Sequence, residues 1–276
     1  MQGETVLIER HAPGRRLLVA EEFAQAVAAL GLPEPEAAAA LFAHGRAGSG
    51  RAATAVVALP GHPGRLHLRA VRHGGWLREV LGGALAGTAR PEAELRATAA
   101  LRVRSAPVPQ PVLAAGWRVA GVFWAGCVGT LHVEDSRDGI AFLTSNPREV
   151  ERLNFAEAAA SAIRDFHDAG GRHPDLHLGN LLLCGPRAEA RVLVIDLDRA
   201  VAGVPSDPST RMRELMRLQR SVEKRGFERS LGPRARARFF SAYTRGDRAL
   251  RRALWANLPR ELRALRRHRL GYRLAR

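Results

Sequence analysis

The chain has 276 residues, of which 46% are hydrophobic and 25% charged, so it is long and apolar enough to bury the core of one large domain or of two lobes. An excess of 43 Lys and Arg over 27 Asp and Glu gives a formal net charge of +16, which favours polyanionic partners. A second explanation stays open, because codon usage in a GC-rich genome also produces a chain dominated by Ala, Arg, Leu and Gly.

Cysteine content and hydropathy limit where the protein works. Cys127 and Cys184 lie far apart and fit neither a disulfide scaffold nor a metal-binding spacing, which favours a reducing compartment. No stretch approaches the ~20 apolar residues that a membrane-spanning helix needs. Residues 1–16 lack the apolar run of a secretory signal. We therefore expect a cytoplasmic protein, soluble or bound peripherally to the inner face of the cytoplasmic membrane.

The amino-terminal part of the chain is rich in predicted strands. Residues 4–20 predict one or two short strands, and residues 21–43 predict helix with a break at 31–35. Glycines open the stretch 45–59, which ends in a β-branched run, and a Gly-His-Pro-Gly turn separates it from an alternating strand at 65–71. These two segments predict a hairpin with a glycine-rich entrance.

Further along, helix gradually replaces strand. Residues 91–104 begin with Pro and acids and end with arginines, the charge order that a helix dipole favours. Residues 108–127 read as two more strands, and the polar stretch 129–139 reads as a hinge. Apolar spacing predicts a strong helix over 148–169, and the chain from about 209 onward is helical and Arg-rich.

The order of these elements predicts an α+β fold. A small β-rich lobe, residues 1–135, precedes a larger helical lobe, residues 136–276. The second lobe also contains two short apolar strands, at 181–184 and 191–198.

The stretch between residues 173 and 198 carries the chemistry. It places His-x-Asp-x4-Asn before one apolar strand, and the next apolar strand ends in Asp-x-Asp. Phosphoryl transfer from ATP needs a carboxylate to orient the acceptor hydroxyl, oxygen ligands for Mg²⁺ and cations on the phosphates. Asp175, Asn180 and Asp196 supply the oxygens on one hairpin. A turn with solvated acids would explain any single Asp, but not the joint pattern.

This pattern resembles the H-R-D-x-x-x-x-N loop and the D-F-G motif of protein kinases, with Pro174, Leu197 and Asp198 in place of Arg, Phe and Gly. It more closely resembles the lipopolysaccharide kinase group, and within it the 3-deoxy-D-manno-octulosonic acid (Kdo) kinases. Those enzymes carry H-x-D-L-N-x-H-N-I-L-L, I-D-F-D-R and a helix like N-L-x-R-L-x-R-S-L-x-K. The resemblance extends from about residue 45 to about residue 224. The residues that match the last helix are Leu215, Leu218, Arg220, Ser221 and Lys224.

The resemblance implies a role for each matched position. Asp175 would orient the acceptor hydroxyl and receive its proton, and Asn180 and Asp196 would bind Mg²⁺. Arg69 falls where kinases place the strand Lys that holds the ATP phosphates, and Arg keeps the charge without being a neutral exchange. Glu94 falls where a helix Glu pairs with that cation.

Other positions are less sharply defined. Gly48, Ser49 and Gly50 are candidates for the turn that covers the ATP phosphates, and a plain loop is an equally open interpretation. His173 is expected to brace the catalytic loop rather than to act as a base. The candidates for contact with the substrate are His177, Asp198, Arg199 and Arg220.

The implied reaction is phosphorylation of a Kdo hydroxyl on a lipopolysaccharide or lipid A precursor, with ATP and Mg²⁺ as cofactors. No A-P-E segment follows Asp198, which argues against a protein substrate. Two alternatives stay open: another small-molecule kinase of this fold, acting on a heptose or an aminoglycoside, and a pseudokinase scaffold, which Arg69 favours and the intact acids oppose. The expected partner is an anionic glycolipid or sugar and not nucleic acid, and the sequence leaves the oligomeric state open.

The carboxyl-terminal segment 245–276 interleaves arginines with leucines and Trp255. It predicts either an amphipathic helix whose cationic face lies on an anionic membrane surface, or the last helix of the lobe with a solvated outer face. A glycolipid substrate at the inner leaflet would favour the membrane interpretation.

Overall fold

The chain folds into two compact units. The computed structural model describes residues 5–43, 53–71, 87–185, 191–203 and 205–274, with side chains up to residue 263. One unit contains residues 1–103 and 109–132, and the other contains 104–108 and 133–276. The short segment 104–108 belongs to the second unit, where the amide of Val194 donates to the carbonyl of Pro107 at 2.8 Å. The division into two functional lobes, residues 1–135 and residues 136–276, stays a prediction.

The first unit is built on a six-stranded sheet in the order β1-β2-β5-β6-β4-β3, and all its neighbouring strands are antiparallel. These strands confirm those predicted from the alternating segments. Gly121, with φ at +50°, lies in the tight loop between β5 and β6, where a positive φ suits the hairpin. The strands are β1 (Leu7–Ala12), β2 (Arg15–Ala20), β3 (Thr54–Ala58), β4 (Arg65–Val71), β5 (Pro111–Ala120) and β6 (Phe123–Leu131).

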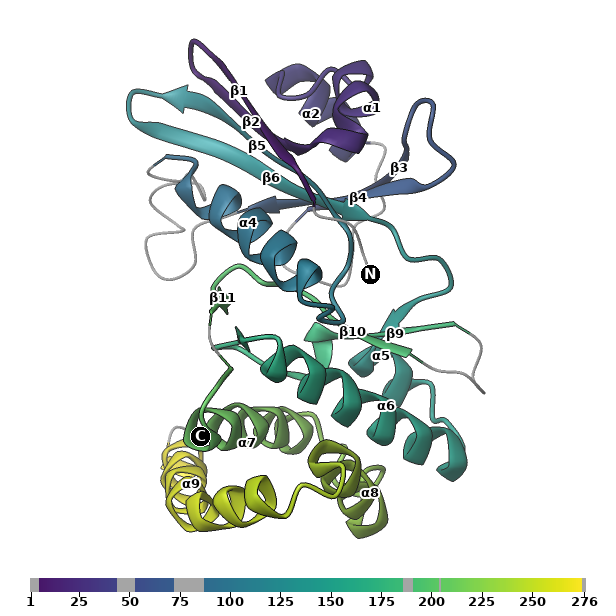
Figure 1. Ribbon diagram of the computed structural model, residues 1–276, viewed down its shortest axis with the longest axis vertical. Coiled ribbons are helices and arrows are strands. Elements are labelled where there is room, and N and C mark those ends of the chain that lie inside the picture. Colours follow the sequence, from purple (N-terminus) through teal and green to yellow (C-terminus); the bar gives the residue numbers. More distant parts are fainter. Residues whose placement is uncertain (1–4, 44–52, 72–86, 186–190, 204, 275–276) are drawn as a thin grey trace. The chain divides into compact units, whose positions relative to one another are not determined.

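Both faces of this sheet are covered, because neighbouring residues of a strand point to opposite faces. In β2, Leu17 and Val19 pack with Phe23, whereas Leu18 packs with Leu95 on the opposite face. Figure 1 shows α4 under one face and α1 and α2 on the other. The helical segments of this unit are η1 (Glu21–Phe23), α1 (Ala24–Ala29), α2 (Pro35–Ala43) and α4 (Ala89–Val103).

The second unit is mainly helical, as predicted, with two small antiparallel sheets ordered β10-β9-β7 and β11-β8. Its helices are α5 (Gly139–Thr144), α6 (Glu149–Asp168), α7 (Pro208–Lys224), α8 (Pro233–Thr244) and α9 (Arg248–Leu274). Its strands and short 3₁₀ turn are β7 (Arg137–Asp138), β8 (Gly171–Arg172), η2 (Leu178–Asn180), β9 (Leu181–Cys184), β10 (Arg191–Val194) and β11 (Val201–Ala202). None of the described helices is both long and apolar enough to cross a membrane.

Two aspartates fix where helices of this unit begin. Asp207 accepts from the amides of Ser209 and Thr210 at 2.9 and 3.1 Å, and Pro208 follows it in the first turn of α7. Asp138 caps α5 in the same way, accepting from two amides at 2.8 Å. The boundary between the two units, after residue 132, lies inside the stretch 129–139 that was predicted to be a hinge, and Asp138 starts a helix at the end of that stretch.

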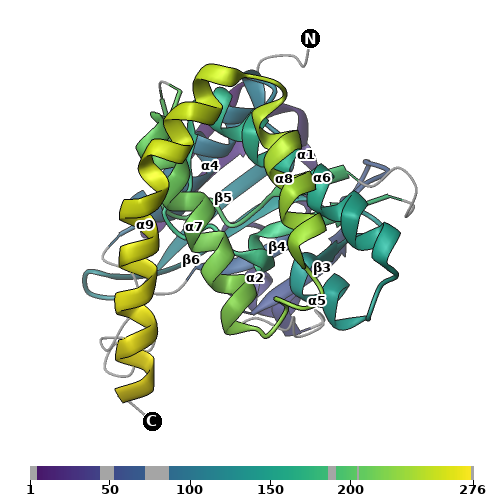
Figure 2. The same cartoon turned by 90° about the horizontal axis from the view of Figure 1, so that it is seen from below.

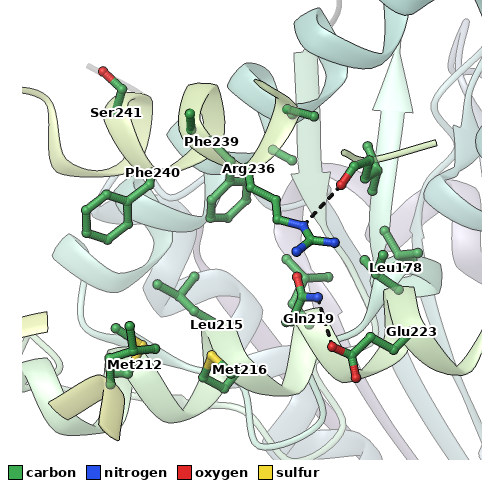
Figure 3. A pocket seen from close by; sticks show the side chains of 18 of the residues that line it. Leu178, Met212, Leu215, Met216, Gln219, Glu223, Arg236, Phe239, Phe240 and Ser241 are labelled. Atoms are coloured by element: carbon green, nitrogen blue, oxygen red, sulfur yellow. Dashed lines mark hydrogen bonds between the residues drawn. The ribbon is translucent and has the colours of Figure 1, made fainter. Parts of the chain in front are cut away.

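Helices α6 to α9 surround an apolar pocket of about 930 Å³. Figure 2 shows α7 and α9 running alongside each other, and Figure 3 shows the side chains that line the pocket from α7 and α8. Two hydrogen bonds involve residues that line the pocket: Gln219 donates to Glu223 at 3.1 Å, and Arg236 donates to the Leu231 carbonyl at 3.2 Å. The lining includes Phe155, Leu215, Met216, Phe239, Phe240 and Trp255.

Candidate active site

His173 ties the loop after β8 to the end of β10. Its Nδ1 accepts from the amide of Asp175 at 3.3 Å, and its Nε2 donates to the carbonyl of Ile195 at 3.1 Å. An amide can only donate and a carbonyl can only accept, so the ring is neutral with its proton on Nε2. Burial lowers the pKa of His173, which favours the same state. These are the hydrogen bonds expected of a structural brace.

Asn180 and Asp196 come together through the backbone. The Asn180 side-chain nitrogen donates to the Asp175 carbonyl at 3.0 Å, so its amide oxygen is the atom suited to a cation. The Ile195 amide donates to the Asn180 carbonyl at 3.0 Å, which brings Asp196 beside the loop. Asp196 has a φ of +62°, a strained backbone conformation of the kind that clusters at functional sites.

The Asp175 side chain is 76% exposed, although the loop beneath it is firmly anchored. Leu176 and Leu178 on either side are buried. His177 lies close, with its Nε2 3.9 Å from the Asp175 carboxylate, too far for a hydrogen bond. A carboxylate that is exposed on a rigid loop is suited to receive a hydroxyl group from solution.

Helix α7 holds the loop from below through Glu214, which is buried. One carboxylate oxygen of Glu214 accepts from the amide of His173 at 2.9 Å and from Nε2 of His167 at 3.1 Å. The Tyr243 hydroxyl, 2.6 Å from Nδ1 of His167, then donates to that nitrogen. Burial lowers the pKa of His167 and raises that of Tyr243, so both stay neutral.

A second anchor from α7 holds the far end of the loop. The Ser221 hydroxyl accepts from the Leu178 amide at 3.1 Å and donates to the Leu218 carbonyl at 2.8 Å. Ser221 matches the family helix in sequence, whereas Glu214 and Tyr243 were not among the predicted site residues. A sequence pattern could have indicated that Glu214 is buried, since it is an acid beside the apolar positions Met212 and Leu215.

In the first unit, Arg69 of β4 and Glu94 of α4 form an ion pair. Nη2 of Arg69 donates to both carboxylate oxygens, at 2.6 and 2.7 Å. Glu94 is 6% exposed and Arg69 is 23% exposed, so the pair is largely shielded from water. The pairing that the sequence predicts is present, and its role toward a nucleotide stays a prediction.

The remaining candidates are only partly described. Asp198 and Arg220 are half-buried and Arg199 is exposed, whereas Gly48, Ser49 and Gly50 lie outside the described residues. Within the described part of the chain, no three or more His, Cys, Asp or Glu residues are arranged to hold a metal ion. The Asn180 and Asp196 oxygens still fit Mg²⁺, which proteins usually bind through one or two carboxylates together with substrate phosphates and water.

Residues 50–243 match the Lipopolysaccharide kinase (Kdo/WaaP) family, a match that covers more than half of the chain. The chain belongs to this family. A 3-deoxy-D-manno-octulosonic acid kinase of Stenotrophomonas maltophilia (strain R551-3) is 34% identical over 142 residues, which are 51% of this chain and 53% of the relative. One from Xanthomonas oryzae pv. oryzae (strain PXO99A) is 36% identical over 141 residues, 50% and 52% of the two chains. The chain thus spans about half the length of the curated relatives it matches.

The fold of this lipopolysaccharide-kinase-family chain is also similar to a solved structure. "WaaP in complex with acyl carrier protein" superposes with a TM-score of 0.59 at 22% identity, covering 91% of this chain and 98% of that one. The predicted α+β, protein-kinase-like fold and the predicted family are confirmed. The family is described as one of lipopolysaccharide kinases.

Proposed function

We propose that this chain transfers the γ-phosphoryl group of ATP to a hydroxyl of Kdo on a lipopolysaccharide or lipid A precursor. The observation that carries the proposal is the loop around Asp175, which α7 anchors at both ends and which leaves one carboxylate exposed. The two Kdo kinases that share 34% and 36% identity with part of the chain support the choice of acceptor.

Each residue has a distinct part in the proposed reaction. Asp175 accepts a hydrogen bond from the acceptor hydroxyl and takes its proton as the phosphoryl group leaves ATP. The oxygens of Asn180 and Asp196 hold Mg²⁺. Arg69, oriented by Glu94, binds phosphate oxygens of the nucleotide. ATP would supply the phosphoryl group, and Mg²⁺ held by Asn180 and Asp196 would supply the positive charge that neutralises the developing negative oxygens.

The test compares phosphate transfer to four acceptors: a Kdo-bearing lipid A precursor, a heptosylated core, an aminoglycoside and water. We expect transfer to the Kdo-lipid, weakened by moderate salt because a +16 chain attracts an anionic acceptor. A polycationic aminoglycoside would need an acid-lined site instead. Transfer only to the heptosylated core or the aminoglycoside would overturn the acceptor, and failure to bind or consume Mg·ATP would favour the pseudokinase alternative.

The apolar pocket among α6 to α9 supports a second ligand, and we propose that it binds an acyl chain. Its volume is in the range of small-molecule sites, and its lining is mainly apolar. The solved structure of similar fold is WaaP in complex with acyl carrier protein, a partner whose name denotes an acyl group.

A brominated fatty acid tests the pocket, because bromine quenches nearby tryptophan and Trp255 lines the pocket. We expect saturable quenching in the natural chain, loss of the signal in Trp255→Phe, and weaker binding in Met216→Asp, which would place a charge in the lining. Equal quenching in the natural chain and in Trp255→Phe would contradict the proposal. Whether the Arg-rich end of α9 also lies on an anionic membrane stays a prediction.

A further inference from the structure

Helix α7 contacts the catalytic loop at two points that lie about 10 Å apart along its axis. Glu214 accepts from the amide of His173, and Ser221 accepts from the amide of Leu178. Arg217 lies between these two contacts, three residues after Glu214 and four before Ser221, so it belongs to the same side of the helix. Its side chain therefore starts beside the part of the loop that carries Asp175.

Arg217 is also part of a row of cations. Arg213, Arg217, Arg220 and Lys224 follow one another at helical spacings of four, three and four residues, which aligns them along one stripe of α7. Like charges at such spacings destabilise a helix by a few tenths of a kcal/mol per pair. Among the described residues, none of the four has a hydrogen bond or ion pair from its side-chain nitrogens. The stripe is therefore poorly explained by stability alone.

The surroundings of Arg217 distinguish it from the rest of the stripe. It is half-buried, and its pKa is lowered by two causes: burial, which is the larger, and the positive charge of Arg220. The carboxylates of Glu214 and Asp175 act in the opposite direction, which places Arg217 within electrostatic range of the reacting carboxylate. A half-buried guanidinium beside a second one would be stabilised by an added anion, because buried charges are normally paired.

We propose that Arg217, assisted by Arg220, binds an oxyanion of the acceptor and so positions the reacting hydroxyl at Asp175. A guanidinium presents a planar fork that holds a carboxylate or a phosphate through two parallel hydrogen bonds. The inference rests on the proposed function, because a Kdo-lipid offers both groups: the sugar carboxylate and the lipid A phosphates. Arg217 is then a specificity-determining residue that a neutral sugar would not engage.

The experiment measures KM for the acceptor and for ATP in the natural chain, in Arg217→Gln and in Arg217→Lys. Arg229→Gln removes the same charge from an exposed loop position and serves as the matched control. We expect KM for the Kdo-lipid to rise about 10- to 100-fold in Arg217→Gln, with KM for ATP unchanged and a smaller rise in Arg217→Lys. An acceptor KM within twofold of the natural chain would overturn the inference.

Two modified acceptors identify the anion. If the carboxylate is the bound group, converting it to an amide makes the natural chain and Arg217→Gln equal, whereas removing the lipid phosphates leaves their difference intact. The reverse result assigns the phosphate and still supports an oxyanion site. A difference that survives both changes would contradict direct binding.

Melting curves and sugar binding separate this inference from structural damage and from the proposed reaction. We expect Arg217→Gln to melt no lower than the natural chain, so a large fall would mark Arg217 as structural and overturn the proposal. Calorimetric titration with the Kdo-lipid in the absence of ATP, which offers both anionic groups, gives a readout without turnover. Binding that depends on Arg217, without phosphate transfer, would sustain the inference and refute only the proposed reaction.

Discussion

At the scale of single residues, the candidate metal site combines the side-chain amide oxygen of Asn180 with the carboxylate of Asp196. The Asn180 amide is turned by its hydrogen bond to the Asp175 carbonyl, and Asp196 is held in a left-handed backbone conformation directly after an apolar strand. The sequence motif names both residues, but neither the turned amide nor the strained φ follows from the motif. Both details depend on the hydrogen bonds that close the hairpin.

The first prediction concerns Asp196→Asn. Asn tolerates a positive φ better than Ala does, so this variant removes the charge with little added strain. We expect turnover to fall by at least about 100-fold, as for loss of one preorganised electrostatic group. Titration with Mg²⁺ in the presence of nucleotide should show weaker metal binding, while the melting temperature stays within about 2 °C. The exposed acid variant Glu228→Gln is the control, and normal activity in Asp196→Asn would remove Asp196 from the site.

At the scale of elements, two sequence patterns predict most of the helices and strands. One is the alternation of side chains along a strand, and the other is the order of acidic and basic residues along a helix. The strands of the first sheet follow from residues that alternate between its two covered faces, as Leu17, Leu18 and Val19 do. The six-residue helix α5 was missed because it is too short for a clear apolar period, and only the Asp138 cap marks its start. The links from His167 to Glu214 and to Tyr243 span 47 and 76 residues and exist only once the helices pack. No local pattern predicts them.

The second prediction concerns the Arg69–Glu94 pair between β4 and α4. Arg69→Ala removes two charge-assisted hydrogen bonds from a carboxylate that is 6% exposed. We expect the free energy of unfolding to fall by about 2–3 kcal/mol. This is at the low end for removal of one partner from a buried ion pair, because Arg69 itself is 23% exposed. Denaturant unfolding measures this change.

The matched control is the pair of Arg15 and Glu34 in the same unit, at 2.7 Å, whose side chains are 40% and 45% exposed. Arg15→Ala should cost less than about 1 kcal/mol, because water screens this pair far more than the Arg69–Glu94 pair. In kinetics, Arg69→Ala should raise KM for ATP and leave KM for the acceptor unchanged. Equal effects of Arg69→Ala and Arg15→Ala on stability would show that the buried pair contributes little.

At the scale of the whole molecule, buried neutral histidines predict how stability depends on pH. Burial lowers the pKa of His67 in the first unit and of His167 and His173 in the second. The unfolded chain therefore binds protons near pH 6.5 that the folded chain does not bind. Stability is complete above that pH and decreases as the pH falls below it, by up to about 1.4 kcal/mol per pH unit for each histidine. The lowered pKa values of Glu9, Asp168 and Asp207 act separately, below about pH 4.5.

The third prediction tests this dependence at one residue. His167→Gln keeps a donor for Glu214 and an acceptor for the Tyr243 hydroxyl, but it cannot take up a proton. We expect the loss of unfolding free energy between pH 7 and pH 5 to be smaller in His167→Gln by up to about 2 kcal/mol. Urea unfolding at pH 7, 6 and 5 measures both chains, and comparing slopes rather than absolute values cancels any general packing cost of the substitution. An unchanged slope would mean that His167 has the same pKa in the folded and the unfolded chain, and a larger loss in His167→Gln would mean that folding raises this pKa through the pairing with Glu214.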